Sequence, residues 1–499
     1  MFQLTILSSL LMRDTFLLQV ALFMLLVMYC VHAQREPYSP LRSLGRYSTG
    51  GPTAANVYLA KPWNSQGNQS LIYTSPANAL FPGTSSFPPH AMYVIANFNG
   101  SALVSQGAVS LPRPQLITTS LPWVNDVVYL PPNSLGLTLP FRSLLTVNGR
   151  FPTGPRFGRS PSVGGTISII NIDSIPNTSV FDITGGDSGA CEWYYNQVQL
   201  MDINEDGLLD VLTARFRDEG ACPPTVQIPP YNFVSEFIAY LQPSSSPLVP
   251  WTFVRLFDFE NATNRGPTGF FQFLDLDNAL YGNNEHPAFE LLSSEFFGTG
   301  ALAIYHLTGT VTSWLQQDKT VARVVVEQGL GGMYDAKVAE LNRQKPAEIV
   351  ATNHITLGSN GIYAFSTVGN FRSGGWIRRA LATNFSVVGR PSNNSARLRP
   401  GEFKVYYPRP NNVPGNSLKP LIALGTDGGG QLVLLTPKTQ KKDSYEYEKV
   451  VLDEQTEANT GCDIIGPLTE DLNNDGYLEL LAPCLSGGFI SVFTHGPSA

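Results

Sequence analysis

Charge is scarce in this chain, because Asp, Glu, Lys and Arg make up only 14 % of its 499 residues and the formal net charge is −7. No basic run is longer than Lys441-Lys442, which argues against a nucleic-acid partner. The sequence lacks a P-loop, an H-E-x-x-H zinc motif and a nucleophile elbow. Its six histidines are scattered without metal-ligand spacing. No linear motif therefore assigns a catalytic activity.

Long hydrophobic runs are also missing, with one exception near the start. Residues 16–31 are almost unbroken hydrophobic, and Val31-His32-Ala33 then gives a small-x-small cleavage site before Gln34. The run is short for a membrane span of about 20 residues. We therefore predict a signal peptide over residues 1–33 and a secreted mature domain over residues 34–499, with no membrane insertion after cleavage. The alternative is an uncleaved signal anchor that tethers the protein to a membrane.

Cysteines are few, and four of the five remain after the predicted cleavage. Four cysteines allow three pairings. Cys191 and Cys222 bracket one acidic loop and Cys462 and Cys484 bracket another, which favours the pairs Cys191–Cys222 and Cys462–Cys484. An oxidising compartment would keep such bonds closed. The glycosylation sequons also suit an extracellular protein, and they lie at Asn68, Asn99, Asn177, Asn261, Asn384 and Asn393.

The acidic loops are the most informative feature that is present. Residues 202–210 read D-I-N-E-D-G-L-L-D, and residues 471–479 read D-L-N-N-D-G-Y-L-E. Ca²⁺ prefers six to eight oxygen ligands at about 2.3–2.6 Å. In these loops, oxygen ligands come from the side chains at positions 1, 3, 5 and 9 and from the backbone carbonyl at position 7. The predicted ligands of two structural Ca²⁺ sites are Asp202, Asn204, Asp206, Leu208 and Asp210, and Asp471, Asn473, Asp475, Tyr477 and Glu479.

An Asx-rich turn without metal is the alternative, since Asn, Asp and Gly dominate turns in any case. The loops are not EF-hands, because that loop ends in Glu at position 12 between helices. Here the residues that follow, 208–214 and 477–482, are short apolar runs typical of strands. The composition agrees, since 45 Gly, 38 Pro, 28 Phe and 20 Tyr suit many short strands joined by tight turns.

The same pattern recurs in degenerate form along the whole chain. Counted at the first loop position, the copies fall near residues 61, 132, 202, 275, 340, 406 and 471, about 65–73 residues apart. The copies near 275, 340 and 406 have lost ligands, and we assign them no calcium. Seven units of about 66 residues account for residues 34–499.

Each unit carries the same sequence of strands. One strand enters the loop and one leaves it, and a third is an alternating apolar run. The third strands are predicted at residues 166–170, 236–241, 301–307, 361–365, 431–435 and 489–493. A fourth begins at an aromatic residue, namely Trp251, Trp314, Trp376 and either Tyr445 or Tyr447. We expect the tryptophans to pack in the core and not to stack on a ligand.

Four strands repeated radially form a β-propeller. We therefore predict an all-β, seven-bladed propeller of four-stranded blades. The last unit lacks a fourth strand, and we expect residues 38–47 to supply it and close the ring. A parallel β-solenoid is the alternative, although its repeats are usually half this length or less.

The recurring D-x-N-x-D-G-x-x-D loop followed by an apolar strand resembles the FG-GAP or VCBS repeats. These repeats build the propeller at the head of integrin α subunits and of various secreted lectins and enzymes. The resemblance implies that the calcium loops are structural and lie on one rim, with ligands on the opposite face or between blades. The Phe-Gly signature survives most clearly at Phe297-Gly298, and Glu479 stands where Asp is usual.

The functional expectation is a secreted, calcium-stabilised binding module for an extracellular glycan or protein ligand. The alternative is a carbohydrate-active enzyme, a lyase or hydrolase, with its active site over the propeller channel. A pair of carboxylates, or a Tyr or His with a carboxylate, converging there with shifted pKa values would favour the enzyme. We expect the ligand face near the insertions at residues 148–165, 217–235 and 276–288.

Overall fold

A computed structural model of the chain describes most of the region from Leu41 to Gly496. The described residues are 41–48, 57–60, 69–75, 91–106, 113–121, 124–136, 139, 141–149, 165–175, 177–185, 193–218, 233–259, 266–282, 288–296, 298–342, 347–354, 360–367, 369–385, 399–409, 418–427, 431–454, 466–484 and 488–496. The predicted signal peptide, Cys191, Cys222, Cys462, Asn68, Asn261 and Asn393 lie outside them.

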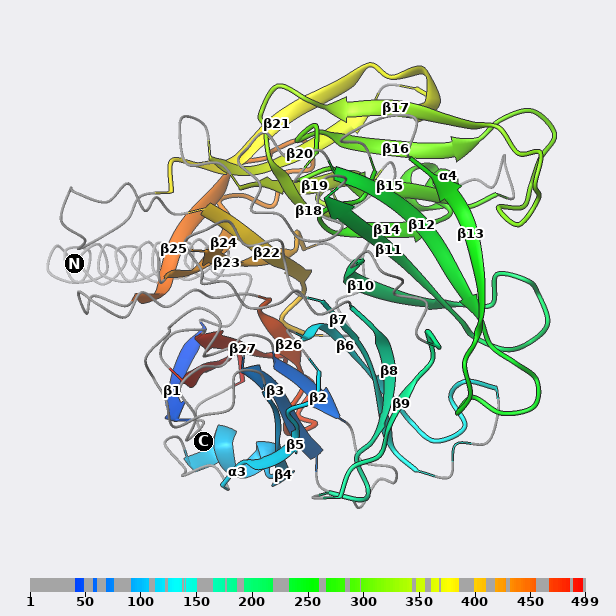
Figure 1. Cartoon of the computed structure of the whole chain (residues 1–499). Coiled ribbons are helices and arrows are strands. Elements are labelled where there is room, and N and C mark those ends of the chain that lie inside the picture. The colour runs from blue at the N-terminus through cyan, green and yellow to red at the C-terminus, as the bar shows by residue number, and fades with distance from the viewer. Residues whose placement is uncertain are drawn as a thin grey trace, which may run out of the picture.

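Seven four-stranded antiparallel sheets form a ring, and six of them are built from consecutive strands (Figure 1). The predicted seven-bladed β-propeller is therefore confirmed, and the solenoid alternative is wrong. Blade 1 contains β2 (Val57–Ala60), β3 (Gln69–Ser75), β4 (Ala91–Phe98) and β5 (Gln115–Thr118). Blade 2 contains β6 (Val124–Leu130), β7 (Ser143–Asn148), β8 (Ile167–Asn171) and β9 (Val180–Asp182). Blade 3 contains β10 (Tyr194–Met201), β11 (Asp210–Asp218), β12 (Phe233–Leu241) and β13 (Thr252–Asp258).

The remaining blades follow the same order. Blade 4 contains β14 (Phe271–Leu274), β15 (Glu290–Ser294), β16 (Leu302–Leu307) and β17 (Val321–Glu327). Blade 5 contains β18 (Met333–Ala339), β19 (Glu348–Asn353), β20 (Gly361–Thr367) and β21 (Trp376–Thr383). Blade 6 contains β22 (Arg399–Tyr406), β23 (Leu421–Asp427), β24 (Gln431–Pro437) and β25 (Tyr447–Glu454). The described residues also contain three short helices, namely α3 (Gly100–Gln106), α4 (Leu276–Tyr281) and the 3-10 turn η2 (Phe371–Ser373).

Blade 7 closes the ring with strands from both ends of the chain. It contains β26 (Leu468–Glu470), β27 (Glu479–Cys484), β28 (Phe489–Thr494) and, as its outer strand, β1 (Arg42–Ser48). β1 pairs antiparallel with β28, from Arg42 opposite Thr494 to Ser48 opposite Phe489. The predicted closure is confirmed. Closing the ring in this way leaves no blade without its fourth strand.

The core is divided into seven apolar clusters, one between each pair of neighbouring blades. Trp251 lies in the cluster between blades 2 and 3, and Trp314 in the cluster between blades 3 and 4, so their core role is confirmed. Trp314 does not begin a strand, however. β17 starts at Val321, and Trp314 lies in the turn before it, where its indole N–H donates to the Phe289 carbonyl at 2.7 Å.

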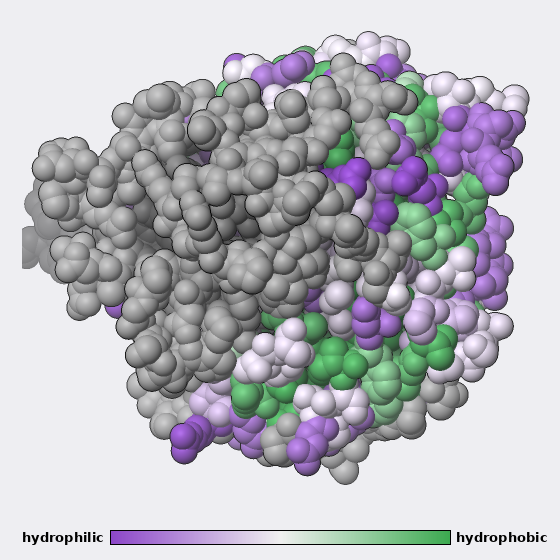
Figure 2. Space-filling view, in the orientation of Figure 1, coloured by the Kyte–Doolittle hydropathy of each residue, from purple (hydrophilic) through white to green (hydrophobic). Residues whose placement is uncertain are grey.

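The first strand of each blade is its inner strand, and inner strands of adjacent blades contact one another around the channel. Outer strands such as β13, β17 and β25 lie at the rim (Figure 1). On the face shown in Figure 2, hydrophilic and hydrophobic residues are interspersed over the described blades. Within the described residues, no helix is long and apolar enough to cross a membrane.

Candidate functional site

The two predicted calcium loops connect the inner and second strands of blades 3 and 7, and they have the same geometry. Asp202 accepts backbone N–H bonds from Asp206 (3.0 Å) and Gly207 (2.8 Å). In the second loop, Asp471 accepts the equivalent bonds from Asp475 (3.2 Å) and Gly476 (3.0 Å). Position 4 of each loop adopts a left-handed conformation, with φ of 60° at Glu205 and 58° at Asn474.

The amide and carboxylate at positions 3 and 5 also match between the loops. Asn204 and Asn473 each donate a side-chain N–H at 2.9 Å to the carboxylate two residues later. Leu208 and Tyr477 each donate a backbone N–H to the same carboxylate, at 2.9 and 2.8 Å. Two sequences that differ at four of nine positions thus adopt one turn, because the Asx side chains and the glycine are shared.

Position 9 is a buried carboxylate in both loops. Asp210 and Glu479 are 0 % exposed. Each accepts the backbone N–H of the residue after position 1, from Ile203 to Asp210 at 3.2 Å and from Leu472 to Glu479 at 2.8 Å. Burial raises the pKa of both carboxyls, that of Glu479 to about 7, and the neighbouring aspartates add to the rise.

These donor types and the repeated turn suit a hard dication. The loops would hold it through Asp202, Asn204, Asp206 and Asp210 and through Asp471, Asn473, Asp475 and Glu479. In the described part of the chain, however, no three His, Cys, Asp or Glu side chains gather as a metal-binding group. Their carboxylates accept backbone N–H bonds instead, so calcium binding stays a prediction.

Blade 4 has the same buried carboxylate but neutralises it with a protein cation. Glu290, 1 % exposed, accepts the Leu276 N–H at 2.9 Å, as position 9 does in the calcium-type loops. Arg372 of η2, in blade 5, forms ion pairs with both Glu290 and Asp277, and its Nη2 lies 2.8 Å from Asp277. α4 carries Asp277, and its Leu276 and Leu280 pack in the core between blades 4 and 5.

Blade 5 has a buried carboxylate at the same position, with different partners. Glu348, 2 % exposed, accepts the Leu341 N–H at 3.0 Å and a Tyr445 hydroxyl bond at 2.7 Å. Burial raises the pKa of Glu348, and these bonds and the charge of Lys419 oppose the rise. Lys419 is 0 % exposed and comes from blade 6. The Lys419 ammonium itself donates to the Ser444 carbonyl. In blade 4, therefore, the next blade supplies an ion-pair partner, whereas in blade 5 it supplies a hydroxyl donor and the charge of a buried lysine.

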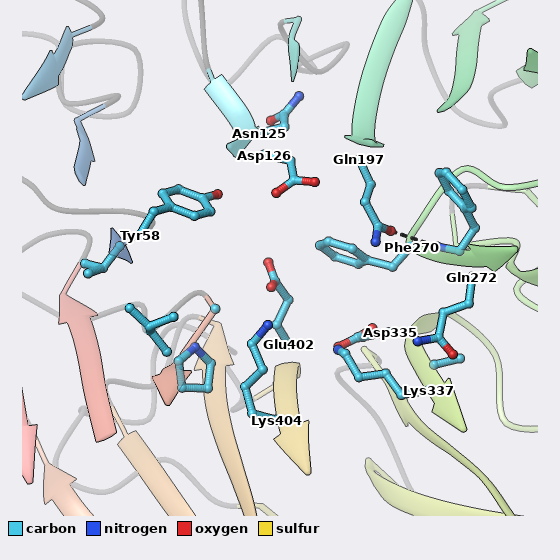
Figure 3. Close-up of a pocket in the computed structure, with 16 residues that line it drawn as sticks. Tyr58, Asn125, Asp126, Gln197, Phe270, Gln272, Asp335, Lys337, Glu402 and Lys404 are labelled. Carbon is cyan, nitrogen blue, oxygen red and sulfur yellow. Dashed lines mark hydrogen bonds and ion pairs between the residues drawn. The ribbon is translucent and has the colours of Figure 1, made fainter. Parts of the chain in front are cut away.

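A second site, which the sequence analysis did not identify, lies at the opposite end of the inner strands. A cavity of about 130 Å³ opens in the channel and is lined by residues of all seven blades. Its polar side chains converge on one space (Figure 3). They are Tyr58, Asn125, Asp126, Gln197, Gln272, Asp335, Lys337, Glu402 and Lys404.

Strand irregularities place several of these side chains at the cavity. The pairing of inner and second strands shifts register at residues 124–126, 195–198, 333–336 and 400–403. Asn125, Gln197, Asp335 and Glu402 lie within these shifts. A bulge leaves an extra residue unpaired and redirects its side chain, which is why bulges are common at functional sites. Periodicity alone gives no signal for such a position.

Four of these nine polar residues hold neighbouring blades together by accepting backbone N–H bonds. An inner strand presents an unpaired edge to the channel, and its backbone N–H groups need acceptors. Asp126 accepts the Val198 N–H at 3.1 Å, and Asp335 accepts the Phe403 N–H at 3.2 Å. Gln197 and Gln272 accept in the same way from Phe271 and Val338, both at 3.1 Å.

Glu402 and Lys404 are different, because neither side chain has a hydrogen bond or ion pair in the described part of the chain. They lie two residues apart on β22, and both line the cavity (Figure 3). Burial raises the pKa of Glu402 to about 7, with Asp335 adding to the rise and Lys337 and Lys404 opposing it. Burial likewise raises the pKa of Asp126.

The expected ligand-face insertions fall at both ends of the propeller. Asn148 pairs with Val124, and Asp218 is the last residue of β11, which pairs with β10, so the insertions after them begin at the cavity end. Residues 150–164 and 219–232 of these insertions lie outside the described residues. The insertion at 276–288 begins at the opposite end, where α4 packs against the core.

The predicted modification sites that the structure describes are accessible. Asn99, Asn177 and Asn384 are exposed. Cys484 is disulfide-bonded, and its predicted pairing with Cys462 involves a residue outside the described part of the chain. Whether the sequons carry glycans stays a prediction.

No family model matches the chain, and no curated protein matches it in sequence. Solved structures match it at low identity. A rhamnogalacturonan lyase of Bacillus licheniformis is 10 % identical over 92 % of each chain, with a TM-score of 0.33. A protein of unknown function from Dyadobacter fermentans is 11 % identical over 91 % of this chain and 99 % of that chain, with a TM-score of 0.39. A glucose dehydrogenase is 12 % identical over 76 % and 97 %, with a TM-score of 0.37. None of these likenesses carries a functional argument.

Proposed function

We propose that this protein is a secreted, calcium-stabilised propeller of the FG-GAP or VCBS type that binds an extracellular glycan or protein ligand. The ligand inserts a small polar group into the channel cavity. The observation that carries the proposal is the pair Glu402 and Lys404, an acceptor and a donor with no hydrogen bond or ion pair among the described residues, in a cavity that polar side chains from six of the seven blades line. Polar groups kept in a cavity without protein partners are typical of a ligand site.

The size of the cavity limits what enters it. At about 130 Å³ it is smaller than the roughly 300–1,000 Å³ of pockets that enclose a drug-sized ligand. The cavity has room for one sugar ring or one side chain, and the rest of the ligand stays outside. Calcium at the far end of the inner strands is structural in this proposal, in keeping with the position of the two acidic loops.

The test uses the mature protein, residues 34–499, in millimolar calcium against immobilised glycans and extracellular proteins. Glu402→Gln and Lys404→Met should each weaken retention of the ligand at least about tenfold, because each removes a charged hydrogen bond. Lys441→Gln, at an exposed position on the rim, is the matched control and should retain the ligand fully. Retention that is equal in all three variants contradicts binding in the cavity.

A second candidate function is carbohydrate cleavage. It is favoured by Glu402, whose pKa is raised to about 7, in one cavity with Asp126 and Tyr58. A carboxyl that titrates near neutral pH suits general acid–base catalysis. Product masses read from the same incubations separate the two functions, since a binding module returns every glycan unchanged and a lyase or hydrolase yields new masses.

A further inference from the structure

Four aromatic side chains form a cluster beside the cavity, between blades 4 and 5. We call Phe270, Phe296, Tyr334 and His354 the mouth aromatics. Tyr334 is central, with ring centroids 5.2 Å from Phe270, 5.1 Å from Phe296 and 4.9 Å from His354. Phe296 also contacts His354 at 5.1 Å. Phe270, Phe296 and Tyr334 are only partly buried, and His354 is 8 % exposed.

A close backbone approach positions this cluster. The Phe270 N–H donates to the Tyr334 carbonyl at 3.1 Å, which joins the starts of the two inner strands. Gly269 permits this contact, because a Cβ there would lie 2.9 Å from the Tyr334 carbonyl and 3.1 Å from the Phe296 Cβ. The backbones of the two blades therefore fix the position of the cluster.

The mouth aromatics are continuous with the polar cavity. Phe270 lines the cavity, and Tyr334 directly precedes Asp335, which also lines it (Figure 3). By contrast, the aromatic cluster of Phe237, Phe271, Phe273 and Trp314 is closed in the core. Partly exposed rings next to the polar side chains of the cavity offer one ligand both an apolar face and hydrogen bonds.

This combination suits a sugar. A pyranose ring has an apolar face of C–H groups that packs on an aromatic ring, and its hydroxyls donate and accept hydrogen bonds around its edge. Carboxylate, amide and ammonium groups in one cavity provide both kinds of partner. The small volume admits about one ring, so the end of a chain enters more readily than its middle.

We propose that the ligand is the end of a glycan chain, with its terminal sugar in the cavity and the adjoining sugar stacked on the mouth aromatics. This inference rests on the proposed function and narrows its ligand to one chemical class. It makes Phe270 and Phe296 specificity-determining residues and assigns the hydroxyl contacts to Glu402 and Lys404.

The experiment measures binding of the mature protein to oligosaccharides attached through their reducing ends, with different sugars at the free end. Phe270→Ala and Phe296→Ala should each weaken the best ligand about tenfold. Phe289→Ala is the control, since Phe289 is 38 % exposed at the calcium-loop end and stacks on Phe273. It should bind as the wild type does. Far-UV circular dichroism spectra of Phe270→Ala and Phe296→Ala that match the wild type guard against a loss of folding.

The outcomes separate the two proposals. If Glu402→Gln weakens binding but the aromatic variants do not, the cavity proposal stands and stacking is contradicted. If no oligosaccharide binds while an extracellular protein does so through Glu402, the glycan class is wrong and the binding module remains. If extending the free end of the best ligand by one sugar leaves the affinity unchanged, recognition of a chain end is contradicted.

Discussion

Four blades place a buried carboxylate at the same point of the fold, but they differ in what neutralises it. In blades 3 and 7, Asp210 and Glu479 have no Lys or Arg partner among the described residues. In blades 4 and 5, Arg372 and Lys419 reach in from the next blade. A buried charge is costly unless it is compensated. We therefore predict that a blade binds a metal where it combines an intact Asx turn with a buried carboxylate that has no Lys or Arg partner among the described residues.

The largest expected effect comes from removing the cation of blade 4. Arg372→Ala should lower the free energy of unfolding by roughly 3–5 kcal/mol, because it leaves Asp277 and Glu290 buried without a counter-charge. Chemical denaturation at neutral pH measures the change. Arg378→Ala is the control, since its pair with Glu327 is 47 % exposed on the arginine side and should cost no more than about 1 kcal/mol. Equal losses in the two variants contradict the comparison.

Loss of calcium from a single site should have the next largest effect. Binding to the native state stabilises by RT ln(1 + [Ca²⁺]/Kd), which is roughly 2.7 kcal/mol per site at a hundred times Kd. Thermal unfolding in millimolar calcium and in strong chelator measures the difference. In the double variant Asp202→Asn/Asp471→Asn, chelator should lower the midpoint of thermal unfolding by less than it does in the wild type. If chelator leaves the thermal unfolding midpoint of the wild type unchanged, both predicted calcium sites are contradicted.

The cavity gives a pH-dependent effect of intermediate size. Burial raises the pKa of Glu402 to about 7, so its protonated form is favoured in the folded state. The cost of ionising it is absent below about pH 4.5, grows up to about pH 7 and is constant above that. Glu402→Gln should therefore be more stable than the wild type at pH 8, by on the order of 1–3 kcal/mol, and equal to it at pH 4.5. The groups that face Glu402 are Asp126, Asp335, Lys337 and Lys404.

Stability curves at several pH values check this expectation. Glu446→Gln, which removes an exposed carboxylate, controls for the change in net charge. A difference between Glu402→Gln and the wild type that does not vary with pH is the result that would refute it.

The smallest effect tests whether the two calcium-type loops share one backbone. Position 4 is left-handed in both, but it is Glu205 in one loop and Asn474 in the other. Asn tolerates this conformation better than Glu does. Glu205→Asn should stabilise, and Asn474→Glu should destabilise, each by about 0.5–1 kcal/mol in thermal unfolding. Changes of the same sign in both loops would contradict the shared turn.

The sequence predicted the architecture well because its signal is local and repeated. The loop positions, the third strands and the closing strand β1 all follow from spacing and apolar alternation. Trp314 was the exception, since an aromatic residue in a turn looks the same as one that starts a strand. Its burial depends on Phe237 and Phe273, which belong to other strands.

The cavity and the internal cations were not predictable by the same means. Arg372 lies 95 residues from Asp277 in sequence, and no pattern joins them. The channel residues depend on register shifts that appear only when strands pair. One clue was present, since Asp335, Lys337, Glu402 and Lys404 are charged residues in runs expected to be inner strands. A charged side chain in a buried strand is costly unless it is paired, so such residues indicate an ion pair or a functional site.

The most direct test of the account is the number of calcium ions bound per mature chain, measured by equilibrium dialysis at neutral pH. We predict two bound ions for the wild type, one for Asp206→Asn and one for Asp475→Asn. Arg378→Ala should bind two ions, as the wild type does. Two ions would mean that blades 3 and 7 take a metal where blades 4 and 5 use Arg372 and Lys419. No bound calcium, or four ions in the wild type, would contradict that division.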